Sequence, residues 1–104
     1  MKHQKLSFEQ QAAEAAGFLR ALGNEHRLQV LCLLAEFGEM NVGQIHAQTT
    51  LSQSALSQHL ARMRDEGLIA YRREGQTLHY SLRDARAVQL LTVLKKIFCP
   101  PDES

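Results

Sequence analysis

Residues 51–67, LSQSALSQHLARMRDEG, carry hydroxyl, amide and guanidinium groups at helical spacing. Ser52 is a good N-cap and Gly67 can adopt the left-handed conformation that ends a helix, so the segment predicts a helix of about four turns. Its apolar residues recur on one side and should face a core: Leu56, Leu60 and Met63. The other residues are of the types that contact base edges and phosphates in a DNA major groove, namely Gln53, Ser54, Ser57, Gln58, Arg62 and Arg64.

These polar residues would equally suit a solvated helix face, and the following segment favours DNA. Two short β-prone runs, residues 69–73 and 78–82, flank Glu74-Gly75-Gln76-Thr77, which is a hairpin signal with glycine at the turn. Three arginines cluster there: Arg72, Arg73 and Arg83. A recognition helix followed by a basic hairpin indicates a winged helix-turn-helix. The predicted DNA contacts are Gln53, Ser54, Ser57, Gln58, His59 and Arg62 on the helix, with Arg73 and Thr77 on the wing.

Four more helices are predicted to position these elements, over residues 7–22, 25–37, 42–48 and 84–98. Asn24 and Asn41 are good N-caps, and Gly38 suits a helix end. The second helix should direct Leu28, Leu31, Cys32 and Leu34 into the core. The predicted fold is mainly α with a two-stranded β-hairpin, in the order α-α-α-α-β-β-α. Residues 1–104 would form one winged-helix domain, with the helix-turn-helix at 41–67 and the wing at 69–82.

The last predicted helix carries more apolar surface than one small core can cover. Ala87, Leu91, Leu94 and Phe98 line one side, and Leu90, Val93 and Ile97 line the next. With the Ala-rich first helix, this arc predicts a two-fold homodimer that reads an inverted repeat with half-sites about 34 Å apart. Burial of the last helix within its own domain is the alternative.

The net charge alone does not point to nucleic acid, its distribution gives modest support for DNA binding, and hydropathy argues against a membrane span. The net charge is only +1, but residues 53–83 hold five arginines against three acidic residues. Such a modest bias predicts weak non-specific DNA binding by a monomer, so dimerisation should supply affinity. No apolar run approaches the roughly 20 residues of a membrane span. Without a signal-peptide pattern at the N-terminus, a cytoplasmic location is expected.

The order of elements resembles the ArsR/SmtB family of winged-helix repressors over nearly the whole chain. The resemblance is carried by residues 52–80, where the serines, Gln58-His59-Leu60, Gly67-Leu68 and the wing fall in register. Two positions depart from the family. Thr50 stands where a glycine is frequent, so the backbone there must avoid the left-handed region. Gln76 stands where an arginine is frequent, which would remove one phosphate contact.

Members of this family usually sense metals, and two family sites can be compared position by position. The Cys-x-Cys pattern is replaced by Met-Asn-Val at residues 40–42. In the site across the last helices, Asp84 matches, but Arg86 replaces a histidine and no further histidine or glutamate follows before Glu103. Because zinc needs about four ligands, neither site can be completed, so no metal or other cofactor is predicted.

Cys32 and Cys99, at the second and last helices, resemble the dithiol of the family's sulfide- and redox-responsive branch. The resemblance implies that reactive sulfur species or oxidants link the two residues and weaken operator binding. A neutral alternative is that Cys32, between Leu31 and Leu33, is only a small hydrophobic residue.

Local chemistry indicates which thiol reacts first. Lys95 and Lys96 should favour the Cys99 thiolate, although the helix C-terminus opposes it, whereas apolar surroundings should raise the pKa of Cys32. We therefore expect Cys99 to attack and Cys32 to resolve. A bond between them would close a loop of 66 intervening residues. A direct disulfide needs Cα atoms within about 7 Å, and a wider pair would require a polysulfide bridge.

The main interpretation is therefore a dimeric repressor with a dithiol switch, and three others remain open. One is a regulator that is non-sensing or senses metal through an unrecognised site. A second is a small thiol oxidoreductase, which lacks Cys-x-x-Cys. A third is a protein-interaction module using the last helix. The resemblance implies a repressor, and an anti-repressor that counteracts another repressor is the alternative. His79 is expected to be solvated, and no ligand cluster is predicted from His3, His26 and His46.

Overall fold

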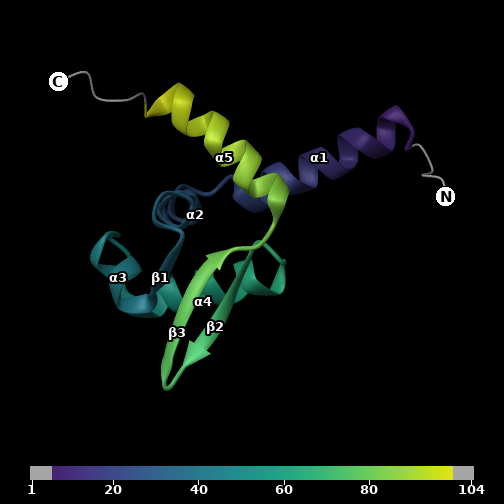
Figure 1. Cartoon of the computed structure of the whole chain (residues 1–104). Helices are drawn as coiled ribbons and strands as arrows, with labels where there is room; N and C mark the ends of the chain where they lie inside the picture. Colours follow the sequence, from purple (N-terminus) through teal and green to yellow (C-terminus); the bar gives the residue numbers. More distant parts are fainter. Residues whose placement is uncertain (1–5, 100–104) are drawn as a thin grey trace.

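The computed structural model describes residues 6–99, which form five helices and one three-stranded antiparallel sheet (Figure 1). His3 and Glu103 lie outside the described residues. The helices are α1 (Phe8–Leu22), α2 (Glu25–Phe37), α3 (Val42–Ala47), α4 (Gln53–Asp65) and α5 (Ala85–Phe98). The strands are β1 (Glu39–Asn41), β2 (Ile69–Glu74) and β3 (Thr77–Leu82). The predicted winged-helix order is confirmed, and β1 is an additional strand that the sequence did not reveal.

The helices begin and end where side-chain chemistry favours it. Each first turn has unpaired backbone N–H groups, and a polar side chain accepts hydrogen bonds from them. These N-caps are Ser7, Asn24, Asn41, Ser52 and Asp84. Gly38 and Gly67 follow α2 and α4 with φ of 84° and 80°, a region that glycine enters without a Cβ clash. The predicted caps and stops are therefore confirmed.

The sheet has the order β1-β3-β2, with β3 in the centre. A two-residue turn, Gly75-Gln76, joins β2 to β3, so Glu74 and Thr77 are paired strand residues rather than parts of the loop. Met40 on β1 pairs with Tyr80 on β3, and both side chains are buried. Because side chains alternate along a strand, this register leaves the other face of the sheet to polar residues.

The core lies where α2, α4, α5 and the sheet meet. Leu56, Leu60 and Met63 of α4 are buried, as predicted. They share one cluster with Leu31 of α2 and Leu91 of α5, among others. The prediction that Cys32 faces this core is wrong, because Cys32 is exposed while the neighbouring Leu31 is buried. The inward face of α2 is thus narrower than its helical spacing suggested.

Apolar side chains remain exposed on α1 and α5. Phe8 and Leu19 of α1 are 82% and 55% exposed, and Val93 and Ile97 of α5 are 50% and 61% exposed. Figure 1 shows α1 extending away from the rest of the domain. None of the helices within residues 6–99 is long and apolar enough to cross a membrane.

Candidate DNA-binding surface and dithiol pocket

Helix α4 presents a continuous polar surface opposite its buried side. The predicted contacts on this surface are all exposed: Gln53, Ser54, Ser57, Gln58 and Arg62. Ser52 caps the helix, since its hydroxyl accepts a hydrogen bond from the Ala55 amide at 3.1 Å. In residues 6–99 no residue other than glycine has a positive φ, so the turn at Thr50 avoids the left-handed region as expected. The α3–turn–α4 unit can therefore present its polar side chains without backbone strain.

The end of α4 is tied directly to the wing. The Arg64 guanidinium lies 5.2 Å from the centre of the Tyr71 ring and donates a hydrogen bond to the Tyr71 hydroxyl at 3.1 Å. Tyr71 in turn meets Tyr80 edge to face, with ring centres 5.6 Å apart. Arg64 therefore fixes the position of the wing relative to α4, a role that its exposed position in the sequence pattern did not indicate.

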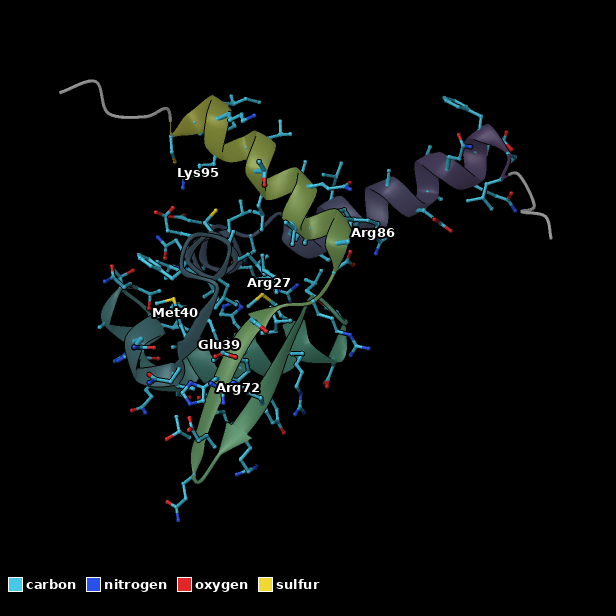
Figure 2. All side chains as sticks on the ribbon, in the orientation of Figure 1. Arg27, Glu39, Met40, Arg72, Arg86 and Lys95 are labelled. Atoms are coloured by element: carbon cyan, nitrogen blue, oxygen red, sulfur yellow. The ribbon has the colours of Figure 1, made fainter. Side chains whose placement is uncertain are left out.

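The arginines of the wing differ in whether their guanidinium groups are free to contact DNA phosphates. Arg72 forms two hydrogen bonds to the Glu39 carboxylate, both at 2.9 Å. Both residues are labelled in Figure 2. This pairing raises the pKa of Arg72 and lowers the pKa of Glu39. Arg73 lies on the opposite face of β2, is exposed, and has no ion-pair partner within residues 6–99. Thr77, also exposed, begins β3 on the other side of the turn.

The two histidines near this surface, His59 and His79, are both partly buried. His59 is half-buried, and its ring centre lies 6.2 Å from that of His26. Burial lowers the pKa of His59, and the charges of Arg27, His26 and Arg62 lower it further. The prediction that His79 is solvated is wrong, because its side chain is only 20% exposed and its Nε2 lies 3.1 Å from Glu74 Oε1.

Arg27 is a structural residue that no sequence pattern indicated. It is 8% exposed, and its Nη1 donates to the Ala21 carbonyl at 2.8 Å and to Glu66 Oε1 at 3.0 Å. Ala21 lies near the end of α1, Arg27 near the start of α2, and Glu66 just after α4. One side chain thus connects three helices. No sequence signal distinguishes Arg27 from a solvated arginine in a first helical turn.

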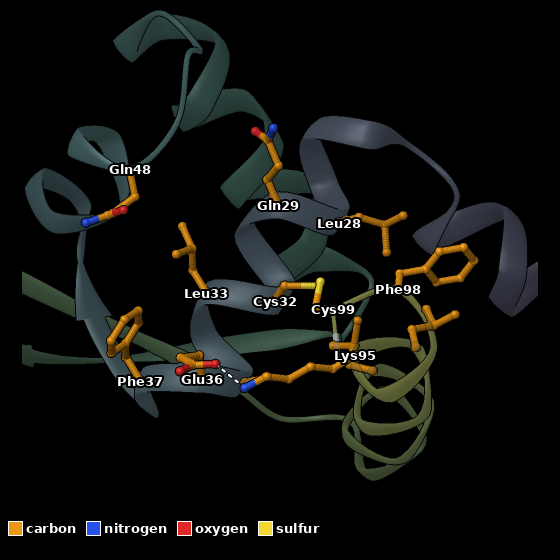
Figure 3. Close-up of a pocket in the computed structure, with 13 residues that line it drawn as sticks. Leu28, Gln29, Cys32, Leu33, Glu36, Phe37, Gln48, Lys95, Phe98 and Cys99 are labelled. Atoms are coloured by element: carbon orange, nitrogen blue, oxygen red, sulfur yellow. Dashed lines mark hydrogen bonds and ion pairs between the residues drawn. The ribbon is translucent and has the colours of Figure 1, made fainter. Parts of the chain in front are cut away.

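Both cysteines line one cavity of about 600 Å³ between α2 and α5 (Figure 3). The thiols are free, and both residues are exposed. The walls are largely apolar and include Leu28, Leu33, Leu94 and Phe98, while Lys95 contributes a charge. The structure therefore brings together two cysteines that are separated by 66 residues in the sequence.

Charges around the cavity affect the two thiols. Burial raises the pKa of Cys32, as predicted, because the cavity walls displace water from a side chain that solvent still reaches. The negative charge of Cys99 raises that pKa further, and the positive charge of Lys95 lowers it. Lys95 forms an ion pair with Glu36, marked by the dashed line in Figure 3, and this partner raises the pKa of Lys95. The Lys95–Glu36 pair is therefore almost neutral as a unit but still supplies an ammonium group beside the thiols.

The candidate metal ligands do not gather. Residues 6–99 contain no group of three or more histidine, cysteine or acidic side chains placed to hold a metal ion. Asp84 instead caps α5 and binds the Arg86 guanidinium at 2.8 and 3.1 Å, which lowers the pKa of Asp84. Arg86 thus engages the carboxylate that a metal at this position would use.

Comparison with known proteins identifies the family. Residues 24–71 match the family described as "Bacterial regulatory protein, arsR family". The transcriptional activator HlyU of Vibrio cholerae is 40% identical over 95 residues, which cover 91% of this chain and 87% of HlyU. This chain belongs to the ArsR family. The Biofilm growth-associated repressor of Agrobacterium fabrum is 37% identical over 98 residues, covering 94% of this chain and 83% of the repressor.

The fold of this ArsR-family chain also matches a solved relative. The structure of reduced HlyU from Vibrio cholerae superposes with a TM-score of 0.81 at 42% identity, covering 88% of this chain and 95% of HlyU. The protein is therefore a transcriptional regulator with a DNA-binding winged-helix fold, and its homologues are regulators rather than enzymes. The interpretation as a thiol oxidoreductase is wrong.

Proposed function

We propose that this protein is a dimeric repressor whose affinity for operator DNA falls when Cys32 and Cys99 are linked by reactive sulfur species or oxidants. One observation carries the proposal: both free cysteines line the same cavity, between α2 and α5. Helix α2 contributes to the core against which α4 packs, so a new bond across the cavity would act on the element that supports the DNA-reading helix.

DNA binding is assigned to the exposed side of α4 and to the tip of the wing. Gln53, Ser54, Ser57 and Gln58 would contact base edges, and Arg62, His59, Arg73 and Thr77 would contact phosphates or the backbone. The lowered pKa of His59 keeps its imidazole neutral near pH 7, so it would act as a hydrogen-bonding group rather than a cation.

Dimerisation is assigned to α1 and α5. Large apolar side chains on these helices would otherwise remain in water, and those that do not line the cavity include Phe8, Leu19, Val93 and Ile97. Two copies joined through these helices would place two α4 helices on the inverted half-sites of one operator. The same arrangement would compensate for the modest positive charge of a single wing.

The switch chemistry follows from the two thiol environments. The Cys99 thiolate attacks the outer sulfur of an organic persulfide, the S–S bond of the donor breaks, and a thiolate leaves. The Cys32 thiolate then attacks the sulfur of Cys99 that carries the persulfide, and hydrosulfide leaves as the disulfide forms. Additional sulfane sulfur would instead give a polysulfide bridge. Cys32 is the slower nucleophile because its raised pKa leaves less thiolate at neutral pH.

Fluorescence anisotropy tests the proposal on a DNA fragment selected by the protein from random sequence. Reduced protein is compared with protein treated with persulfide, peroxide or zinc, and mass spectrometry of the same samples identifies any link. Cys32→Ser and Cys99→Ser variants serve as controls. We expect persulfide to lower the affinity only when both cysteines are present. Unchanged affinity after complete Cys32–Cys99 linkage would refute the switch and leave DNA binding intact.

A second candidate is activation by displacing another repressor. It is favoured by the relatives, because HlyU is described as an activator whereas the protein from Agrobacterium fabrum is described as a repressor. A reporter assay with the selected operator distinguishes the two. A lone repressor lowers expression in the absence of other regulators, whereas an anti-repressor has no effect unless its competitor is present.

A further inference from the structure

The cavity that holds the two thiols is larger than a sulfur bridge requires. Its volume is about 600 Å³, and cavities of about 150 Å³ already hold benzene. An inorganic polysulfide would leave most of the apolar wall in contact with water. The apolar residues of this wall come from both helices and include Leu28, Leu33, Leu94 and Phe98. The walls therefore favour a molecule with an apolar body the size of one or two rings.

The charge of the cavity favours a neutral molecule. Lys95 is a charged lining residue, and its ammonium already forms an ion pair with Glu36, which also lines the cavity. The Glu36 carboxylate would repel an anionic ligand. An ammonium has three N–H donors, so Lys95 retains donors for a carbonyl oxygen after it has bound Glu36. The cavity is thus suited to an uncharged hydrogen-bond acceptor rather than to a carboxylate or phosphate.

The proposed dimerisation surface leaves this cavity free. Val93 and Ile97 lie on a flank of α5 that does not line the cavity, whereas Leu91, Leu94, Lys95 and Phe98 face it. A ligand can therefore enter between α2 and α5 of one protomer without displacing a second copy from Val93 and Ile97.

We infer that the cavity captures neutral apolar compounds with a conjugated carbonyl, such as enones and quinones, by covalent addition to Cys99. The inference rests on the proposed function for the choice of Cys99 as the first nucleophile. The Cys99 thiolate forms an S–C bond to the β-carbon, and the C=C electron pair moves to the oxygen as an enolate. The enolate takes a proton from Lys95, which regains one from water. No external oxidant is consumed, and a molecule of this class would be a second type of effector.

Two maleimides of nearly equal size test this selectivity. N-phenylmaleimide and N-(4-carboxyphenyl)maleimide are each added to the reduced full-length protein, and intact-mass spectrometry gives the rates. Peptide mapping identifies the modified cysteine. Rates are divided by those of a neutral cysteine ester with the same reagents, which removes the intrinsic reactivity. We expect the neutral reagent to be favoured about tenfold. The carboxylate of the other reagent would hold its ring out of the cavity, and burial of about 56 Å² of apolar ligand surface gives a tenfold difference.

Variants assign the preference to the cavity. Phe98→Gln should reduce the preference for the neutral reagent to below about threefold, because it replaces an apolar side chain of the cavity wall with a polar one. Phe98 is already exposed, so the substitution should not disturb the core. Lys95→Gln should slow the capture of N-phenylmaleimide, and Lys96→Gln, which changes the neighbouring lysine outside the cavity, should slow it much less. Circular dichroism verifies that each variant is folded.

Three results would overturn the inference. One is equal normalised rates for the two maleimides, and another is an equal effect of the Lys95 and Lys96 variants. The third is capture that slows as protein concentration rises, since a second copy would then occupy the cavity. Operator binding by persulfide-treated protein is measured by anisotropy on the same preparation. If persulfide does not change the operator affinity, the proposed switch is refuted, whatever the maleimide rates show about the cavity.

Discussion

Cys32 shows how a residue can be placed on the right helix and yet on the wrong side of it. Its position between leucines indicated a buried hydrophobic residue, but the side chain is exposed at the wall of a cavity. The raised pKa was predictable, because leucines on the same helix displace water wherever that helix packs. The cavity was not predictable from the sequence, because it depends on how α5 packs against α2.

The raised pKa of Cys32 predicts how its alkylation responds to pH. In a Cys99→Ser variant, the first cause of the shift, burial, remains. The thiolate fraction, and so the rate with iodoacetamide, should be lower than that of a cysteine peptide at pH 8. The rate should increase about tenfold per pH unit until the raised pKa is passed, above the peptide value of about 8.5. A pH profile that coincides with that of the peptide would contradict the prediction.

Arg73 and Arg72 are adjacent, and the structure predicts different effects of their removal. Arg73→Ala should weaken operator binding and lower the salt dependence by about one counterion per protomer, because an unpaired guanidinium is lost from the wing. The matched control is the double variant Arg72→Gln/Glu39→Gln, which removes an ion pair without a change in net charge. Anisotropy titrations at several salt concentrations measure both. An unchanged salt slope for Arg73→Ala would remove Arg73 from the interface.

At the scale of elements, local signals predicted the helices and missed β1. Caps and glycines depend on residues within one or two turns, so the boundaries of α2 and α4 could be read directly from the chain. Strand β1 has three residues, and its pairing with β3 joins Met40 to Tyr80, which lies 40 residues further along the chain. No local sequence pattern predicts a partner strand that lies so far along the chain.

Arg27 joins α1, α2 and the end of α4, so its hydrogen bonds should contribute to the free energy of unfolding. Arg27→Ala should reduce the free energy of unfolding by about 2 kcal/mol, because it removes two hydrogen bonds of a buried guanidinium. Glu66 is 41% exposed, and solvent moderates the effect. Urea unfolding followed by circular dichroism measures it. Arg20→Ala, an exposed arginine on α1, is the control and should lie within about 0.5 kcal/mol of the wild type.

At the scale of the whole molecule, the family and fold followed from element order, and the site followed only in part. Sequence placed the polar residues of α4 on its exposed side, because Leu56 and Leu60 fix the opposite side. The link between Arg64 and Tyr71, by contrast, depends on how the wing folds back against α4. Such contacts between elements are tertiary, and residue spacing along the chain does not predict them.

The proposed dimer predicts which substitutions separate the copies. Ile97→Asp should place a charge in the apolar interface and raise the dissociation constant of the dimer by at least about a hundredfold, as an unpaired buried charge costs several kcal/mol. Sedimentation velocity over a range of concentrations measures it. Phe37→Asp is the control, since Phe37 is similarly exposed but belongs to α2. Equal sedimentation of both variants would exclude α5 from the interface.

The projecting helix α1 has a consequence for the amount of protein a cell can keep. A protomer without a partner would expose Phe8 and Leu19 on a helix that extends away from the domain. Such a segment would unfold locally at little cost and would then be open to proteases, whereas the proposed dimer contact would protect it. Protein made in excess of dimer formation would be removed by degradation. Turnover would thereby set a lower limit to the concentration at which the regulator persists.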